Sequence, residues 1–231
     1  MIGSIKVSGD NYTRAVLMFR ECKVNPRMNL LFGENGAGKT TFIKYINKCV
    51  NSKVLSKNLH LLGGYDTFTL YSFSNSENNY NNVGHSRRFG FDIDPGMALK
   101  KYAVSSLSEG QGIIYSLEDF LYFLENNLPY KKNTSNVITI DEMDSGLSVD
   151  NIAYVMKRLN KLLEIRDDVQ LFISFNNYAT CEFNQDDIIS MYTGKSIKIK
   201  GYKQFRHYLN LNRNKLLKKR KNNQFTGEIL Y

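Results

Sequence analysis

The stretch GENGAGKT at residues 33–40 fits the pattern of a glycine, four variable residues, Gly-Lys, and then Ser or Thr at every fixed position. Glycines let backbone N–H groups curl around a phosphate, and the lysine adds positive charge beside the outer phosphate oxygens. Residues 28–32 before the loop form a short apolar run that predicts a buried strand. Residues 40–50 after it repeat apolar side chains at helical spacing. Strand, loop and helix in this order predict a nucleotide-binding phosphate loop.

The residues of this loop have distinct expected roles. Lys39 is expected to contact the β and γ oxygens and to act in catalysis, and the Thr40 hydroxyl is expected to ligate Mg²⁺. A chance match in a glycine-bearing turn is the alternative, and the flanking strand and helix argue against it. The full set expected at the phosphates is Asn35, Gly36, Ala37, Gly38, Lys39, Thr40 and Thr41.

A second motif is the run VITIDE at residues 137–142, an apolar strand that ends in two acids. In an α/β sheet the carboxyl ends of parallel strands meet the bound ligand, so these acids are expected beside the phosphates. Asp141 would hold Mg²⁺ through water, and Glu142 would polarise the attacking water as general base. Such a run alone could be a solvated strand end. The phosphate loop upstream favours the catalytic interpretation.

The sequence SLSEGQ at residues 106–111 resembles the LSGGQ signature of ABC ATPases. The resemblance implies that Ser108, Gly110 and Gln111 contact the γ-phosphate of ATP held by another protomer, with Ser108 taking part in catalysis. A helix start aims N–H groups and a dipole at an anion, which suits that role. Glu109 replaces the first glycine of the signature. The bare peptide could also be a helix cap with Ser108 at the N-cap.

The run DEMDSGLS at residues 141–148 resembles the D-loop region of the same family. The resemblance implies that Asp144 lies at the seam between two protomers and contributes to the nucleotide site. Met143 stands where transporter subunits usually carry proline, which makes the motif more similar to the SMC, RecF and OLD-like ATPases. The resemblance to ABC-type ATPases covers about residues 28–180.

Two features of the family have no direct counterpart. Glutamine is missing between Lys39 and Gln111, so the usual Q-loop ligand is replaced, and the candidates are Ser74, Asn75 and Glu77. The switch histidine is missing too, and its place falls on Phe175, Asn176 or Asn177. We take Asn176 as the γ-phosphate ligand. Because asparagine forms hydrogen bonds but carries no charge, slow hydrolysis is expected.

Tyr12 stands about where the family places an aromatic that stacks on adenine. Stacking of this side chain on the base is one interpretation. Packing of a tyrosine into the core from a β-strand is the alternative. The same segment, residues 4–20, is predicted to form two strands that are joined by a turn at residues 9–11.

The remaining pattern predicts an α/β fold. Further strands are expected at 67–73, 169–175, 188–192 and 196–202, and helices at 110–124, 149–165 and 203–221. The fold class is that of a P-loop NTPase with ABC-type topology, which implies a mixed central sheet, an N-terminal antiparallel β-subdomain and an inserted helical lobe with the signature. We expect one domain over 1–231, divided into a nucleotide-binding core (1–50 and 133–200), the lobe (51–132) and a basic extension (201–231).

Composition limits the classes of partner. The net charge of +9 is concentrated in residues 195–231, where eleven Lys or Arg face Glu228 alone, while the rest has 20 basic and 21 acidic residues. This tail could bind nucleic acid or an acidic protein. Three scattered cysteines predict neither disulfides nor zinc, which fits a cytoplasmic protein. The apolar runs are too short to cross a bilayer, so no direct membrane insertion is expected.

Three functions remain open at this stage. The first is an ATPase head that dimerises around ATP and Mg²⁺ with itself or a related head, and regulates an effector in DNA repair or antiviral defence. Long heptad repeats are missing from the sequence, so only a compact head without coiled coil fits. The second is the nucleotide-binding subunit of an ABC transporter. The third is a nucleotide-gated binding module with negligible turnover.

Overall fold

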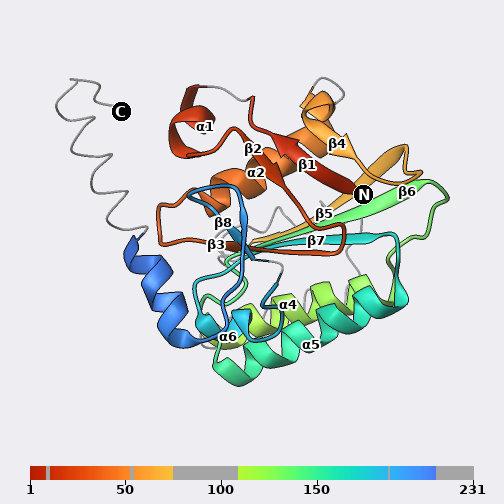
Figure 1. The fold of residues 1–231 in the computed structure, drawn as a ribbon. Helices are drawn as coiled ribbons and strands as arrows, with labels where there is room; N and C mark the ends of the chain where they lie inside the picture. Colours follow the sequence, from red (N-terminus) through yellow and green to blue (C-terminus); the bar gives the residue numbers. More distant parts are fainter. Residues whose placement is uncertain (9–10, 53–54, 75–108, 187, 212–231) are drawn as a thin grey trace.

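The strands around the phosphate loop form one six-stranded sheet in the computed structural model, which describes residues 1–8, 11–52, 55–74, 109–186 and 188–211 (Figure 1). Neighbouring strands are parallel except β8 and β9, which pair antiparallel, so the predicted mixed sheet is confirmed. In sheet order the strands are β5 (Thr67–Ser74), β6 (Thr134–Asp141), β7 (Val169–Ser174), β3 (Met28–Phe32), β8 (Ile188–Ser190) and β9 (Ser196–Ile197).

The three central strands β3, β6 and β7 are buried along their whole length. Because alternate side chains of a strand point to opposite faces of the sheet, the side chains of these strands belong to two separate buried clusters. In β3, Leu30 belongs to the cluster on one face and Leu31 to the cluster on the other. A sheet that is covered on both faces explains why these strands carry apolar residues at consecutive positions rather than at alternate ones.

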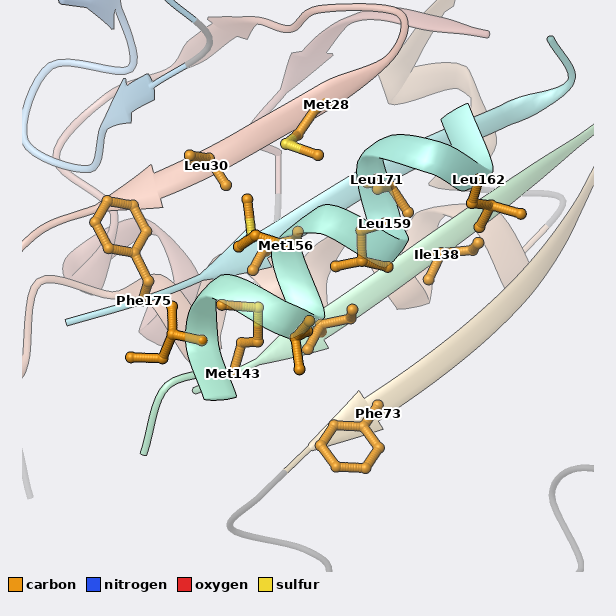
Figure 2. Packing of buried hydrophobic residues seen from close by; sticks show 14 of the residues in the cluster. Met28, Leu30, Phe73, Ile138, Met143, Met156, Leu159, Leu162, Leu171 and Phe175 are labelled. Atoms are coloured by element: carbon orange, nitrogen blue, oxygen red, sulfur yellow. The ribbon is translucent and has the colours of Figure 1, made fainter. Parts of the chain in front are cut away.

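Helices α4 (Glu109–Asn126) and α5 (Val149–Ile165) cover one face of the sheet (Figure 1). Met156 and Leu159 of α5 pack with Leu171 of β7 in the buried cluster of that face (Figure 2). Ser148 caps α5, since its Oγ accepts a hydrogen bond from Asn151 N at 3.3 Å. Both helices were predicted at nearly these bounds.

Helix α2 (Lys39–Asn51) lies on the opposite face, together with a three-stranded antiparallel sheet. That sheet has the order β2 (Glu21–Lys23), β1 (Ile2–Lys6), β4 (Leu59–Leu61), and it confirms the predicted antiparallel subdomain. The 3-10 helix η1 (Leu55–Asn58) connects α2 to β4.

The prediction of two strands joined at residues 9–11 is wrong. After β1 the chain forms helix α1 (Asn11–Val16), and the partner strand β2 begins only at Glu21. Asp and Asn favour helix starts as well as turns, so the residues that predicted a hairpin turn suit a helix start equally well. Leu17, just after α1, is buried in the cluster shared with α2.

Strands β4 and β5 fall within residues 51–132, the range expected to form the inserted lobe. They instead pair with β1 and β6, so residues 59–61 and 67–74 belong to the two sheets. The short β4 was not predicted, whereas β5 matches the expected strand at 67–73. The division into core, lobe and extension otherwise stays a proposal.

At the C-terminal side, β8 and β9 form the predicted strand pair. A short helix α6 (Tyr178–Cys181) follows β7, and residues 202–211 are helical as far as the structure describes them. Phe205 fixes this last helix to the core, since its ring lies 5.3 Å from that of Phe32 and 5.5 Å from that of Tyr178. Residues 212–231, the rest of the predicted basic helix, lie outside the described residues.

Gln170 of β7 ties the two sheets together through a fully buried side chain. Its Oε1 accepts a hydrogen bond from Ile2 N at 2.9 Å, and its Nε2 donates to Ile2 O at 2.8 Å and to Asn25 O at 2.7 Å. Replacing this side chain would remove all three bonds at once. The N–H and C=O of Ile2 would then lose their partner, and water could not replace it.

Replacing Gln170 should therefore be costly. We expect Gln170→Leu, which keeps the volume but loses the three bonds, to lower the free energy of unfolding by about 2–4 kcal/mol. Urea denaturation followed by circular dichroism measures this. Gln185→Leu, at an exposed position after α6, is the control and should change stability by less than about 0.5 kcal/mol. A Gln170→Leu chain as stable as the parent would contradict this role.

Candidate nucleotide-binding site

The phosphate loop connects β3 to α2, and two of its glycines have backbone angles that other residues avoid. Gly36 has φ 82° and Gly38 has φ 90°. A Cβ on Gly38 would also lie 3.0 Å from Val16 Cγ1 and 3.1 Å from Leu17 Cδ2. Ala37 N donates to Glu34 O at 3.0 Å and closes the turn. The loop thus packs against the end of α1 and leads directly into the first turn of α2.

Lys39 is the first residue of α2 and only 6% exposed. Its Nζ donates to Gly33 O at 2.6 Å, to Glu34 O at 3.2 Å and to Asn176 Oδ1 at 2.8 Å. Burial lowers the pKa of this ammonium, and the nearby carboxyls of Asp144, Glu142, Asp141 and Glu34 oppose that shift. The ammonium is therefore held at the mouth of the loop, within the field of four acids.

The two acids predicted at the end of β6 lie at this same edge of the sheet. Asp141 is the last residue of β6 and 2% exposed, and Glu142 is partly exposed just beyond it. Ser174, the last residue of β7, donates its Oγ proton to Asp141 Oδ1 at 2.5 Å. The same Oγ accepts from Glu142 N at 2.7 Å. A buried hydroxyl on the neighbouring strand therefore contacts both acids.

Glu142 has an unusual backbone conformation for a residue with a side chain. Its φ is 54°, in the left-handed region that costs a non-glycine residue about 1–2 kcal/mol. Such conformations persist where surrounding bonds hold them, and they concentrate at functional sites. Here the bonds come from the end of β7: Glu142 N donates to Ser174 Oγ, and Met143 N donates to Ser174 O at 3.2 Å.

Asp144, expected at the seam between protomers, is 6% exposed and binds its own chain. Its Oδ2 accepts from Asn176 N at 2.8 Å and from Asn177 N. Its Oδ1 is buried and has no hydrogen-bond partner within the part of the chain that the structure describes. Burial raises the pKa of this carboxyl, and the two backbone N–H bonds oppose the rise. Asp144 therefore anchors the segment that carries Asn176.

Three residues were candidates for the place of the switch histidine, and the structure separates them. Phe175 is fully buried in the core. Asn177 is the N-cap of α6, with its Oδ1 accepting from Ala179 N at 3.0 Å. Asn176 is exposed and its amide oxygen accepts from Lys39 Nζ. Of the three, Asn176 is the one that contacts the predicted phosphate-binding lysine.

Two residues of the site were not singled out from the sequence. Tyr192 belongs to no recognisable sequence motif. Its Oη nevertheless accepts a hydrogen bond from Glu34 N at 3.1 Å and so supports the phosphate loop. Ser174 bridges the two acids. The only sequence feature that could have indicated Ser174 is its place as a polar residue in an otherwise apolar run. The sequence around Tyr192 contains no such feature.

Several predicted residues fall outside what the structure describes or lie at its margin. Ser108, Asn75 and Glu77 lie outside the described residues. Gly110 is the second residue of α4, and Gln111 follows it with an exposed side chain. A Cβ on Gly146 would lie 3.0 Å from Ile113 Cδ1, so the first turns of α4 adjoin the loop after Glu142.

The two remaining candidates lie at opposite sides of the loop. Tyr12 lies within α1 rather than on a strand. The structure does not describe its side chain, so stacking of this side chain on adenine stays a prediction. Ser74, the end of β5, is paired in register with Asp141. A Q-loop substitute at Ser74 would therefore stand next to the acids.

The residues present fit a nucleotide with Mg²⁺. Gly33 has no space for a side chain, since a Cβ there would lie 2.6 Å from Ala37 Cβ, so the close turn of the loop requires glycine. Asn35, Gly36 and Thr41 are partly or fully exposed around the loop. Hydroxyl and carboxylate oxygens are the ligands Mg²⁺ prefers, and Thr40 with Asp141 supplies one of each. No cluster of three His, Cys, Asp or Glu suited to a metal occurs among the described residues.

Comparison with solved structures identifies the fold. The structure of cbiO1 from Clostridium perfringens, part of the ABC transporter complex cbiONQ, matches with a TM-score of 0.50 and 14% identity, over 85% of this chain and 87% of that one. This chain has the fold of an ABC-type P-loop ATPase. The shared architecture includes the mostly parallel central sheet and the antiparallel sheet described above.

Two further solved structures match with lower TM-scores. An SMC head domain from Thermotoga maritima matches over 87% of this chain and 99% of its own length, with 13% identity and a TM-score of 0.48. The C. elegans PCH-2 structure matches with 14% identity and a TM-score of 0.36 over 75% of this chain, which spans 36% of that protein. No family model and no curated protein matches the sequence. Among the described helices, none has the length and apolar character that crossing a bilayer demands.

Proposed function

We propose that this chain binds ATP with Mg²⁺ and hydrolyses it to ADP and phosphate. The observation that carries the proposal is the convergence of Lys39 with Asp141 and Glu142 at the carboxyl ends of β3 and β6. A buried ammonium at a helix N-terminus suits a polyphosphate, and paired acids beside it suit metal binding and water activation. Phosphate release from Mg-ATP, compared between the parent chain and Glu142→Gln, tests it.

Each residue then has a role that follows from its position. Lys39 and the N–H groups of residues 35–41 would hold the β- and γ-phosphates, and Thr40 and Asp141 would hold the metal. Bound Mg²⁺ neutralises charge on the phosphate oxygens. Glu142, at the rim of the same edge and partly exposed, would accept the proton of the attacking water. Ser108 of a second head would complete the γ-phosphate contacts.

Turnover is proposed to be slow. The contact that Asn176 makes with Lys39 places an uncharged amide where the family has a histidine. Its amide group could donate a hydrogen bond to a γ-phosphate but adds no positive charge to the transition state. Lys39 must also leave its bonds to Gly33 O and Glu34 O in order to reach a phosphate.

The wider role is proposed to be that of a head that closes around ATP with a copy of itself or with a related head, and so regulates an effector in DNA repair or antiviral defence. Support comes from the DEMDSGLS motif and the basic C-terminal region. The alternative is the nucleotide-binding subunit of a transporter, as cbiO1 is part of a transporter complex. Copurification with a polytopic membrane protein would favour the alternative.

The C-terminal region supports nucleic acid as a partner. The helix at residues 202–211 is fixed to the core by Phe205, and it exposes Lys203 and Arg206 on the outside. Lys195 and Lys200, on the segment that leads into it, are exposed as well. Residues 212–231 add six further Lys or Arg. Together these charges could neutralise several backbone phosphates.

Removing these charges should weaken binding to DNA. We expect truncation after Leu211, combined with Lys203→Gln and Arg206→Gln, to lower affinity for a duplex oligonucleotide at low salt by about tenfold or more and to flatten its salt dependence. Fluorescence anisotropy over a salt series measures both. Phe205 is left in place so that the core contact survives, and Lys157→Gln on α5 is the control. Undiminished affinity would exclude this surface, and a parent chain that binds no DNA at low salt would favour an acidic protein as the partner instead.

A further inference from the structure

The hydroxyl of Ser174 links the two acids of the candidate site. Ser174 is fully buried at the end of β7, with its Oγ 2.5 Å from Asp141 Oδ1 and 2.7 Å from Glu142 N. A serine hydroxyl has one proton to donate and lone pairs to accept with. Its proton therefore goes to the carboxylate, and a lone pair takes the backbone N–H. One side chain thereby fixes a side chain and a backbone on the adjacent strand.

These contacts continue the pairing of β6 and β7 beyond the point where the regular ladder ends. The last paired residues of the two strands are Ile140 and Ile173. One step further, Ser174 meets Asp141 and Glu142 through its side chain, and Met143 N through its carbonyl at 3.2 Å. The chain after β6 is thus held against β7 while it turns away from the strand direction.

The turn requires such support, because Glu142 has φ 54°. A residue with a Cβ leaves this region when nothing holds it there. Fixing this backbone conformation sets the direction of the Cα–Cβ bond of Glu142, and so the region that its carboxylate can reach. The Asp141 carboxylate is oriented in the same way, since its Oδ1 accepts the hydrogen bond of the Ser174 hydroxyl.

We propose that Ser174 is a positioning residue for ATP hydrolysis, which orients the Asp141 carboxylate and holds the Glu142 backbone in its catalytic conformation. This inference rests on the proposed ATPase function. Ser174 is fully buried and its hydroxyl is bonded to Asp141 and Glu142, so the proposed role needs no contact with the nucleotide. Its loss should therefore lower the rate of hydrolysis and leave nucleotide binding by the phosphate loop nearly intact.

Three variants at this position separate the hydroxyl from the packing. Ser174→Ala removes the hydrogen bonds, and Ser174→Cys keeps the volume with a weak donor. Ser174→Thr keeps the hydroxyl, and a β-branched side chain is well tolerated in a strand. Each variant is assayed for phosphate release over a range of Mg-ATP, for Mg-ADP affinity by calorimetry, and for thermal unfolding.

We expect kcat of Ser174→Ala and Ser174→Cys to fall by about 30-fold or more, as for misplaced catalytic groups elsewhere, with Mg-ADP affinity within about threefold of the parent. Ser174→Thr should restore kcat to within about fivefold. In a Glu142→Gln background, Ser174→Ala should lower the rate by a smaller factor than in the parent, because part of its effect acts through Glu142.

Other outcomes overturn the inference in distinguishable ways. Unchanged kcat in Ser174→Ala, or Ser174→Thr as slow as Ser174→Ala while both are folded, removes the role of the hydroxyl. Loss of rate, ADP affinity and thermal stability together in Ser174→Cys shows a structural role only. If the parent chain releases no phosphate at all, the proposed ATPase function fails, and this inference fails with it.

Discussion

Lys39→Ala is expected to lower the affinity of the chain for Mg-ATP by about 100-fold or more, since charge-assisted hydrogen bonds to a phosphate contribute about 1.5–3 kcal/mol each. The ammonium is buried at the start of α2 with donors aimed at loop carbonyls and Asn176. Because a polyphosphate offers stronger acceptors than these groups, the lysine would exchange them for phosphate oxygens. Equilibrium titration with a fluorescent ATP analogue measures the loss.

The effect must be separated from a loss of folding. The carboxyls of Asp144, Glu142 and Asp141 lie in the electrostatic field of Lys39, so its removal takes away positive charge that offsets them. Lys39→Met, which keeps the length of the side chain, should show the same loss of affinity. Lys48→Ala removes an exposed lysine from the same helix and should bind like the parent. A folded Lys39→Ala chain with parent affinity would show that the phosphate loop is not the binding site.

Glu142→Gln is expected to reduce phosphate release by about 100-fold or more, the usual contribution of a general base, while ATP affinity stays within about threefold. The amide keeps the shape of the side chain and loses its ability to accept a proton. Phosphate release at saturating Mg-ATP, together with the binding titration, measures both effects.

A second acid near Lys39 provides the control for Glu142→Gln. Glu34 lies in the phosphate loop, and its charge also acts on Lys39. Glu34→Gln should change the rate by less than about threefold, because it removes a similar charge without removing a base. Equal rates for the parent and Glu142→Gln would mean that Glu142 is not a base, and would favour a binding module with negligible turnover.

The sequence predicted well those features whose cause is local. The phosphate loop needs glycines at fixed spacing, and Gly36 and Gly38 indeed have positive φ angles. Helix α5 matches its predicted bounds because an N-cap serine precedes a sustained amphipathic repeat. The apolar runs of β6 and β7 predicted parallel neighbours, and their register brings Asp141 beside Ser174.

The features that could not be predicted depend on distant parts of the chain. Strand β4 has only three residues, and its pairing with β1 decides its structure. Segment 11–16 forms a helix because its ends meet the phosphate loop and α2, which no local pattern shows. The bridging role of Ser174 and the burial of Asp144 arise because the segments that follow β6 and β7 contact each other.

The most direct test of the account is equilibrium binding of Mg-ATP to the intact parent chain, read as nucleotide bound per chain. We predict saturation at one nucleotide per chain, competition by ADP, and loss of binding in Lys39→Ala. A parent chain that is folded and retains no nucleotide at millimolar Mg-ATP would contradict the central claim that the loop at residues 33–40 is a phosphate-binding site.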